Sequence, residues 1–463
     1  MEAIVKTVLT ELEYDSSVID TKQEKRVNEW LKWFGGKTKH HDYFIYNGAQ
    51  KVKKTYKSLN ILSQACGDLS DFFFNEKLEI TIDKEKVQEK INDCLKQNGF
   101  LDNSNKLMQL VKALGTGAFV PYLDNNVLKI NYINATGIVI LSSNNSDIQD
   151  ILFWSTKKVK EGIEYYFNIH ILGDDGYVIH NKKYLKKIDS TEYIKQNMKP
   201  EIEKIETKSF LPKFAIITTA EVNNIDINSP YGISCYANAL DIVLSLDRAY
   251  DSFDNEIALG KKRVYVPSNS VQFNISKNGE TIPAFDENDV TFYQYPGKEN
   301  DKLTESSFDL RIDPITSAVQ GQLNLLTSKI GLGHNYYKFK DGQAYVNTDN
   351  VLSSNSDVYR KIKKQENILT RAITQLIYAI AELIGIKEEF EVSIFYDDTI
   401  IEDMEKTRKQ AQTEYNSKLI SKAQYYRDVY KLDEQSAIKF AKKMNEEIKM
   451  QEITDGSEFN LDE

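Results

Sequence analysis

Two helical patterns that flank a strand-rich segment constrain this chain most strongly. The first pattern begins at Ser229-Pro230, an N-cap residue followed by a proline suited to a first helical turn, and runs through 229–260 with Gly260 as its stop. The second begins at Asp313-Pro314 and carries apolar residues spaced by three and four up to residue 330. Between them, short strand patterns occupy 271–275 and 290–295. The sequence therefore predicts two long helices with a small β-module at their far end.

The remainder of the chain predicts a mixed α+β protein of several regions. Helical patterns occupy 21–34, 58–74, 83–97 and 104–114, and antiparallel strands are expected within 117–184. A polar stretch, 182–208, is expected to be a linker. After the second long helix come a Gly- and Asn-rich loop (331–355), a strongly amphipathic helix (357–383), a strand (390–396), helical pieces near 400–415, 421–430 and 433–450, and an acidic tail from 451.

Composition narrows the class of protein. The chain has 463 residues, more than the roughly 300 at which a single core stops growing, so several domains are expected. Its formal net charge of −10 is unlike that of proteins that grip nucleic acid through a basic surface. An acidic wall can instead suit a conduit, because it repels phosphates and keeps a moving duplex unbound. No apolar run approaches the roughly 20 residues of a transmembrane helix, and the first 13 residues do not resemble a signal peptide, so we expect a cytoplasmic protein without membrane contact.

The sequence motifs that would indicate a nucleotide-binding, metal-binding or catalytic site are incomplete. Gly35-Gly36-Lys37-Thr38 resembles part of a phosphate-binding loop, but position 31, where that motif needs glycine, is leucine. His40-His41-Asp42 is interpreted as a surface loop rather than a metal site, and Asp397-Asp398 as solvated or channel-facing carboxylates. Cys66, Cys94 and Cys235 lack paired spacing and are expected to be free thiols. We expect no catalytic residue, metal or cofactor and hence no enzyme; the enzymatic alternative is a cryptic nuclease or toxin domain in the C-terminal helices.

Several sequence blocks resemble one family. The run that begins Ser229-Pro-Tyr-Gly-Ile-Ser-Cys-Tyr and continues to Leu259-Gly-Lys-Lys-Arg-Val-Tyr-Val-Pro267 is similar to the portal proteins of tailed bacteriophages, in the siphophage branch that infects Gram-positive bacteria. The same family shows counterparts of Gly-Thr-Gly-Ala at 115–118, of Asn-Ser-Asp-Val-Tyr-Arg at 355–360 and of the pattern at 419–430. The resemblance covers most of 55–450.

The resemblance implies a helix-rich portal fold assembled into a homo-oligomeric ring, dodecameric in the virion. Each subunit would divide, in chain order, into a wing (1–228), a first stem helix (229–260), a clip (261–310), a second stem helix (311–330), a tunnel loop (331–355), a long wing helix and strand (356–396) and a helical crown with an acidic tail (397–463).

It also implies a function. The ring would form the DNA channel at the capsid vertex, dock the terminase large subunit during packaging, and then bind the head-to-tail adaptor for DNA retention and ejection. Double-stranded DNA, major capsid protein and scaffold protein would be further partners, and the chain would pass from the host cytoplasm into the virion. The alternative is another structural virion component, a minor capsid or connector protein.

Three sets of candidate residues follow from this assignment. For the tunnel-loop lysines the alternative is that they are merely exposed loop residues. The candidates are Asp247, Asp251, Asp254 and Glu256 for the channel-lining stem, His334, Lys338 and Lys340 for the tunnel loop, and Lys261, Lys262, Arg263, Glu280, Asp286 and Glu287 for the clip surface that docks terminase or adaptor.

Overall fold

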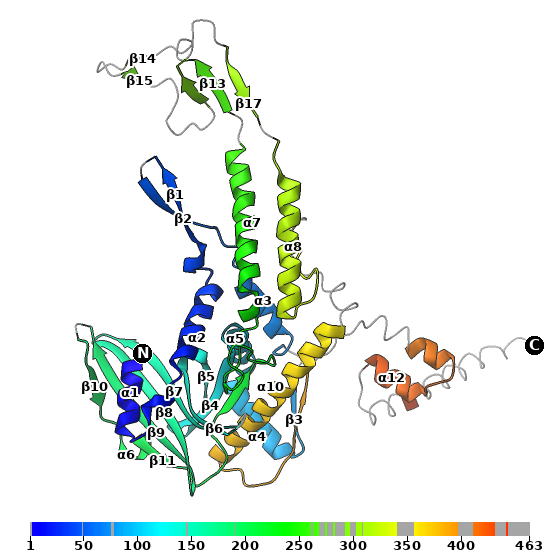
Figure 1. The fold of residues 1–463 in the computed structure, drawn as a ribbon. Helices are drawn as coiled ribbons and strands as arrows, with labels where there is room; N and C mark the ends of the chain where they lie inside the picture. The colour runs from blue at the N-terminus through cyan, green and yellow to red at the C-terminus, as the bar shows by residue number, and fades with distance from the viewer. Residues whose placement is uncertain are drawn as a thin grey trace, which may run out of the picture.

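The computed structural model has a broad base of sheets and helices, from which two helices rise side by side to a small strand module (Figure 1). This mixture confirms the α+β class. The structure describes residues 2–48, 50–75, 78–144, 147–188, 190–260, 263–267, 274–275, 281–282, 292–296, 302–307, 309–339, 356–396, 411–430 and 441–442.

The helical lead-in follows the expected patterns. Asp20 caps its second helix by accepting hydrogen bonds from the backbone N–H groups of Lys22 and Gln23, and Gly35 ends that helix, as the sequence predicts. Its apolar residues join the largest core of the molecule. The helices are α1 (Glu2–Glu11), α2 (Thr21–Phe34), α3 (Ile61–Asp71), α4 (Glu85–Gln97) and α5 (Phe100–Leu114), with the short 3-10 turns η1 (Ser16–Val18) and η2 (Lys39–His41) among them.

Two antiparallel sheets make up the predicted β-region. One has the order β10-β9-β8-β7-β6, with β11 pairing with β9, and the other the order β12-β4-β5. Strands β10 and β11 and helix α6 fall within 182–208, so the prediction of a plain linker there is wrong. The elements are β4 (Thr116–Asp124), β5 (Val127–Asn134), η3 (Ala135–Gly137), β6 (Ile138–Asn144), β7 (Asp147–Val159), β8 (Gly162–Gly173), β9 (Gly176–Lys187), β10 (Tyr193–Gln196), α6 (Pro200–Glu203), β11 (Lys204–Glu206) and β12 (Ala215–Thr218).

The rising helices are α7 (Leu240–Leu259) and α8 (Ile312–Ile330), preceded by η4 (Ala237–Ala239). Helix α8 confirms its prediction, but the expected helix start at Ser229 is wrong. The backbone of 229–236 is not helical, because the base holds it: Gly232 N–H donates to Thr116 Oγ1 (3.0 Å), and Tyr231 OH accepts from Ile140 N–H (2.7 Å). Tertiary hydrogen bonds thus override a local capping signal, and α7 is about 30 Å long.

At the far end of α7 and α8, strand β13 pairs in parallel with β16 and antiparallel with β17. This agrees with the expected strand-rich module between the two helices. A second isolated hairpin, β1–β2, lies beside α7 in Figure 1 and was not predicted. The strands are β1 (Asp42–Asn47), β2 (Gln50–Thr55), β13 (Arg263–Pro267), β14 (Asn274–Ile275), β15 (Thr281–Ile282), β16 (Phe292–Tyr295) and β17 (Thr304–Ser306).

The long amphipathic helix is α10 (Ser356–Leu383), and its apolar face lies in the main core through residues such as Leu369, Ile373 and Ile377. Strand β18 (Val392–Phe395) follows and pairs with β3 (Glu79–Ile82), so chain segments far apart in sequence share a sheet. Near the C-terminus, α12 (Lys422–Tyr430) matches its prediction, whereas the tail, all of 400–410 and most of 433–450 lie outside the described residues. None of the described helices is long and apolar enough to cross a bilayer.

Candidate functional site

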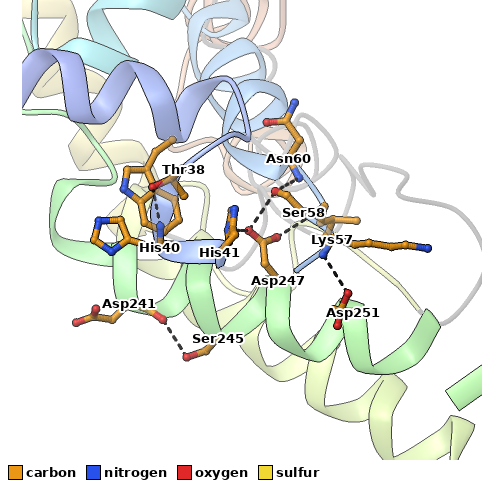
Figure 2. A network of polar contacts seen from close by, with 12 residues as sticks. Thr38, His40, His41, Lys57, Ser58, Asn60, Asp241, Ser245, Asp247 and Asp251 are labelled. Atoms are coloured by element: carbon orange, nitrogen blue, oxygen red, sulfur yellow. Dashed lines mark hydrogen bonds and ion pairs between the residues drawn. The ribbon is translucent and has the colours of Figure 1, made fainter. Parts of the chain in front are cut away.

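The most elaborate polar network of the rising helices lies on one face of α7. Asp247, Asp251 and Asp254 are spaced by four and three residues, which places them on the same side of an α-helix. They face the two chain segments that lead into and out of the β1–β2 hairpin (Figure 2). The base of the hairpin is therefore fastened to α7 by carboxylates.

Asp247 is the buried centre of this network, with 1% of its surface exposed. Its Oδ1 accepts from Leu59 N–H (2.9 Å), and its Oδ2 accepts from Ser58 Oγ (3.1 Å). Nε2 of His41, itself 2% exposed, lies 2.8 Å from the same Oδ2, without the angle of a hydrogen bond, so this contact is electrostatic. Burial raises the pKa of Asp247, and the Leu59 N–H and the His41 ring oppose that rise.

The next two carboxylates hold the strand that leaves the hairpin. Asp251 accepts from the backbone N–H of Lys57 (3.0 Å) and from Asn255 Nδ2 (2.8 Å). Asp254 pairs with the Lys57 ammonium, a contact that raises the pKa of Lys57. Arg248, on the same helix, lies over the Tyr56 ring at 5.6 Å. Both flanks of the hairpin are thus bound to α7, while the strands themselves extend beyond these contacts.

Glu256 bridges the upper ends of the two long helices. It accepts from Arg311 Nε (3.1 Å) and NH2 (2.8 Å) and from the Arg311 backbone N–H (3.0 Å), immediately before α8. These hydrogen bonds lower the pKa of Glu256 to about 2. The pair fixes the point where the chain returns from the β-module into α8.

These contacts correct the stem prediction. Asp247 and Asp251, expected on a channel-facing surface, are buried at 1% and 9% exposure and bind groups of their own chain, so that expectation is wrong for their side chains. Asp254 remains substantially exposed, at 45% of its side chain. The interpretation of residues 40–42 as a surface loop is also wrong for His41, since its ring is buried against Asp247.

The start of the expected tunnel loop is described up to residue 339. His334 is exposed and Lys338 half-buried, whereas Lys340 lies outside the described residues. Gln320 on α8 holds this segment: its Nε2 donates to Tyr337 O and its Oε1 accepts from Phe339 N–H, both at 2.8 Å. The Tyr337 hydroxyl donates to Asp68 Oδ2. The loop therefore leaves the base from a fixed point beside α8.

Of the clip candidates, only Arg263 belongs to the described residues, at the start of the central strand β13. Lys261, Lys262, Glu280, Asp286 and Glu287 lie outside them. Within the described ranges, no group of three or more His, Cys, Asp or Glu side chains is placed to hold a metal ion. Cys66 is a buried free thiol whose pKa is raised by burial.

Two glycines from the sequence blocks that carry the family resemblance meet in the base. A Cβ on Gly115, at the end of α5, would lie 2.4 Å from Gly232 O, and a Cβ on Gly232 would lie 2.1 Å from Gly115 O. Thr219 braces the same junction, because its N–H donates to Gly115 O and its Oγ1 donates to Ile233 O. The blocks are distant in sequence but form one joint, from which the chain enters α7.

Comparison with known families decides the identity. Residues 17–452 match the family described as phage portal protein, SPP1 Gp6-like, which spans nearly the whole chain and includes the base, both rising helices and the strand module. The chain belongs to this family. Its function is accordingly that of a phage portal protein at the capsid vertex, and the portal proteins of such a family are structural components rather than enzymes. The match does not separate the siphophage branch infecting Gram-positive bacteria from other branches, so that part stays a prediction.

Solved structures and curated proteins add little to this assignment. Two similar structures are the neck of a native GTA particle computed with C12 symmetry (8% identity, 78% of this chain and 87% of that chain covered, TM-score 0.38) and the neck of an empty GTA particle computed with C6 symmetry (8% identity, 80% and 88% covered, TM-score 0.38). At this level of similarity neither carries an argument about this portal protein. No curated protein matches the chain.

Proposed function

We propose that this portal protein assembles into a homo-oligomeric ring, dodecameric in the virion, through which double-stranded DNA enters and leaves the capsid. The observation that carries the proposal is the family match over residues 17–452, which includes the paired helices α7 and α8. In this assignment α7 and α8 form the stem, the strands between them belong to the clip, and the sheets with α1–α5 and α10 belong to the wing.

The clip, residues 261–310, is proposed to dock the terminase large subunit during packaging and the head-to-tail adaptor afterwards. Support comes from its place: β13, β16 and β17 lie at the far end of the stem in Figure 1, away from the base. A surface at the end of a channel can bind successive partners without rearrangement of the wing. The candidates remain Arg263 and the charged residues 261, 262, 280, 286 and 287.

The proposed channel lining differs from the first expectation. Asp247 and Asp251 fasten the hairpin, so the acidic stem candidates that remain for a channel-facing role are Asp254 and Glu256, each already paired with a cation. Lys338 and Lys340 are proposed to meet phosphates at the tunnel loop, where each contact is weak and salt-dependent. Removal of both lysines is expected to change packaging or DNA retention and to leave ring assembly intact.

Electron microscopy of the purified protein, with class averages along the symmetry axis, tests the proposal. Closed rings with a central hole of duplex width are expected, and they also give the subunit number. A monomer or dimer at high protein concentration, even with scaffold and capsid proteins added, would favour the alternative of a minor capsid or connector protein.

A further inference from the structure

The β1–β2 hairpin leaves an unusual surface uncovered. Every residue of β2 is exposed, and on β1 the rings of Phe44 and Tyr46 are 54% and 75% exposed. The register pairs Phe44 with Lys53 and Tyr46 with Lys51, so these four side chains share one face of the ribbon. Lys51 Nζ lies 4.3 Å from the centre of the Phe44 ring. The tip of the hairpin therefore presents aromatic rings together with ammonium groups.

A two-stranded ribbon of this kind is marginally stable alone, and no described strand adds to its edges. Its position is instead imposed at its base by the Asp247 contacts with His41, Ser58 and Leu59 and by the Asp251 contact with the Lys57 backbone. A rigidly mounted hairpin with an exposed aromatic tip is typical of an element that completes its packing on a partner.

The charges on the hairpin indicate an acidic partner. Between residues 42 and 57 there are four lysines and one carboxylate, in a chain of net charge −10. Two of the lysines are neutralised within the chain, Lys53 by Asp42 and Lys57 by Asp254. Lys51 and Lys54 remain exposed, and of these two Lys51 lies on the face that carries Phe44 and Tyr46.

A complementary surface lies at the start of α8. Asp309 and Asp313 are exposed there, Leu310 between them is 47% exposed, and Pro314 follows. Arg311, in the same stretch, has its charge matched by Glu256. This edge thus offers two carboxylates beside an apolar side chain, which suits an ammonium group beside aromatic rings.

The hairpin and the start of α8 lie at matching heights along the stem, on opposite flanks of the subunit. Figure 1 shows the hairpin on one side of α7 and α8 on the other, with the hairpin tip and the start of α8 at a similar level. In a ring, rotation about the axis keeps each residue at its own height, so a head-to-tail interface joins surfaces of equal height from opposite flanks of two copies. The hairpin of one chain and the α8 edge of the next meet this condition.

We propose that the β1–β2 hairpin docks on the start of α8 of a second copy of this chain, through Phe44, Tyr46 and Lys51 on one side and Asp309, Leu310 and Asp313 on the other. The inference rests on the proposed ring and assigns one of its subunit contacts. In this arrangement the hairpin of each subunit contacts the stem of its neighbour. The buried contacts of Asp247 fix the orientation of the hairpin for this contact.

Charge reversal in the full-length chain tests the docking. One variant carries Lys51→Glu, a second carries Asp309→Lys and Asp313→Lys, and a third combines all three. A matched control for the first variant carries Lys160→Glu, which changes the net charge equally at the exposed turn between β7 and β8. Mass photometry and analytical ultracentrifugation over a range of protein concentrations give the concentration at which half of the chains are in rings.

Each of the first two variants is expected to raise this midpoint by roughly tenfold or more, since like charges would face each other, and the combined variant to return it to within about threefold of the unaltered chain. The control should assemble like the unaltered chain. A folding defect near Asp313, in the first turn of α8, could not produce that rescue.

The contrary outcomes are separable. If the unaltered chain forms rings and the hairpin variant assembles equally well, the docking is refuted and the ring stands. If both variants fail and the combination does not recover, the hairpin binds another surface, and the assignment to α8 is overturned. If the unaltered chain forms no rings at any concentration, the proposed function falls and this inference with it.

Discussion

Nε2 of His41, just before β1, lies 2.8 Å from Oδ2 of Asp247 on α7, and both side chains are almost fully buried. A charged group in such a position is tolerated only where partners compensate for its lost hydration. Asp247 has three partners, and all of them belong to the segments that flank the hairpin. Asp247 therefore ties both flanking segments to α7, and Asp251 and Asp254 add further contacts to Lys57.

Replacement of Asp247 by alanine is expected to destabilise this region by roughly 3 kcal/mol, because it leaves the Leu59 N–H without its acceptor and the buried His41 ring without the carboxylate beside it. Asp247→Asn should cost less, since the amide oxygen can still accept the Leu59 bond. Hydrogen exchange of the Leu59 and Lys57 amides measures the effect where it occurs. Ser252→Ala, on the exposed side of α7, is the control and should change stability by less than about 0.5 kcal/mol. Unchanged protection of Leu59 in Asp247→Ala would contradict the anchoring role.

The burial of His170 in the large sheet predicts that the free energy of unfolding depends on pH. Its ring is 1% exposed, packs edge-on against Phe153 and Phe214, and has a pKa lowered to about 3 by burial and by the nearby Lys213 charge. The folded protein then binds fewer protons than the unfolded chain between about pH 3 and the ordinary histidine value near 6.5, so stability falls as pH is lowered through that window. From pH 7 to pH 5 the loss due to His170 should be about 2 kcal/mol.

Urea unfolding at the two pH values measures this contribution. The variant His170→Gln should lose about 2 kcal/mol less than the unaltered chain on going from pH 7 to pH 5, whatever its stability at pH 7. Phe153→Leu, in the same core, perturbs packing without removing a titrating group and should keep the full pH dependence. Parallel pH dependences of the unaltered chain and His170→Gln would show that the histidine is not held neutral.

The Arg311–Glu256 pair predicts an effect on stability that appears only at acidic pH. With its pKa lowered to about 2, Glu256 stabilises the folded state above the ordinary glutamate value, and this contribution is lost as pH falls through about 2. In Arg311→Gln the pKa of Glu256 should return toward its ordinary value, because the guanidinium provides the largest of its hydrogen bonds. Carbon-detected NMR titration of glutamate carboxyls, with Glu256→Gln for assignment, measures the shift. A pKa that stays near 2 without Arg311 would contradict this cause.

Periodic patterns predicted the elements whose burial is continuous along one face. Helices α8 and α10 have apolar residues at helical spacing that enter a single core, and their bounds follow from the sequence within a few residues. The hairpin β1–β2 was also readable in principle, since Asn47-Gly48 stands between alternating residues, a strong hairpin signal. The pattern analysis nevertheless assigns no element to 43–57 and interprets only His40-His41-Asp42, as a surface loop.

Other features could not be read from local sequence at all. The start of α7 depends on hydrogen bonds that Gly232 and Tyr231 make to strands more than ninety residues earlier, and these override the Ser229-Pro230 signal. The carboxylates of α7 have partners near residues 41 and 57–59, separated by nearly two hundred positions. A polar residue on a helical face looks solvated until its partner in space is known.

Replacement by alanine is predicted to have opposite effects on stability at two glycines, Gly232 at its junction with Gly115 and Gly321 in the middle of α8. A Cβ on Gly232 would lie 2.1 Å from Gly115 O, and backbone cannot yield as a flexible side chain can, so Gly232→Ala should destabilise the base by roughly 3 kcal/mol or more. Gly321, in the middle of α8, would meet nothing within 4 Å, and alanine favours the helix there. Gly321→Ala should therefore stabilise the isolated subunit by about 0.5 to 1 kcal/mol. Thermal and urea unfolding of the two variants beside the unaltered chain measure both signs. A Gly232→Ala protein as stable as the unaltered one would mean that the joint between the two sequence blocks tolerates a side chain, and that its close backbone contact does not set the position from which α7 rises.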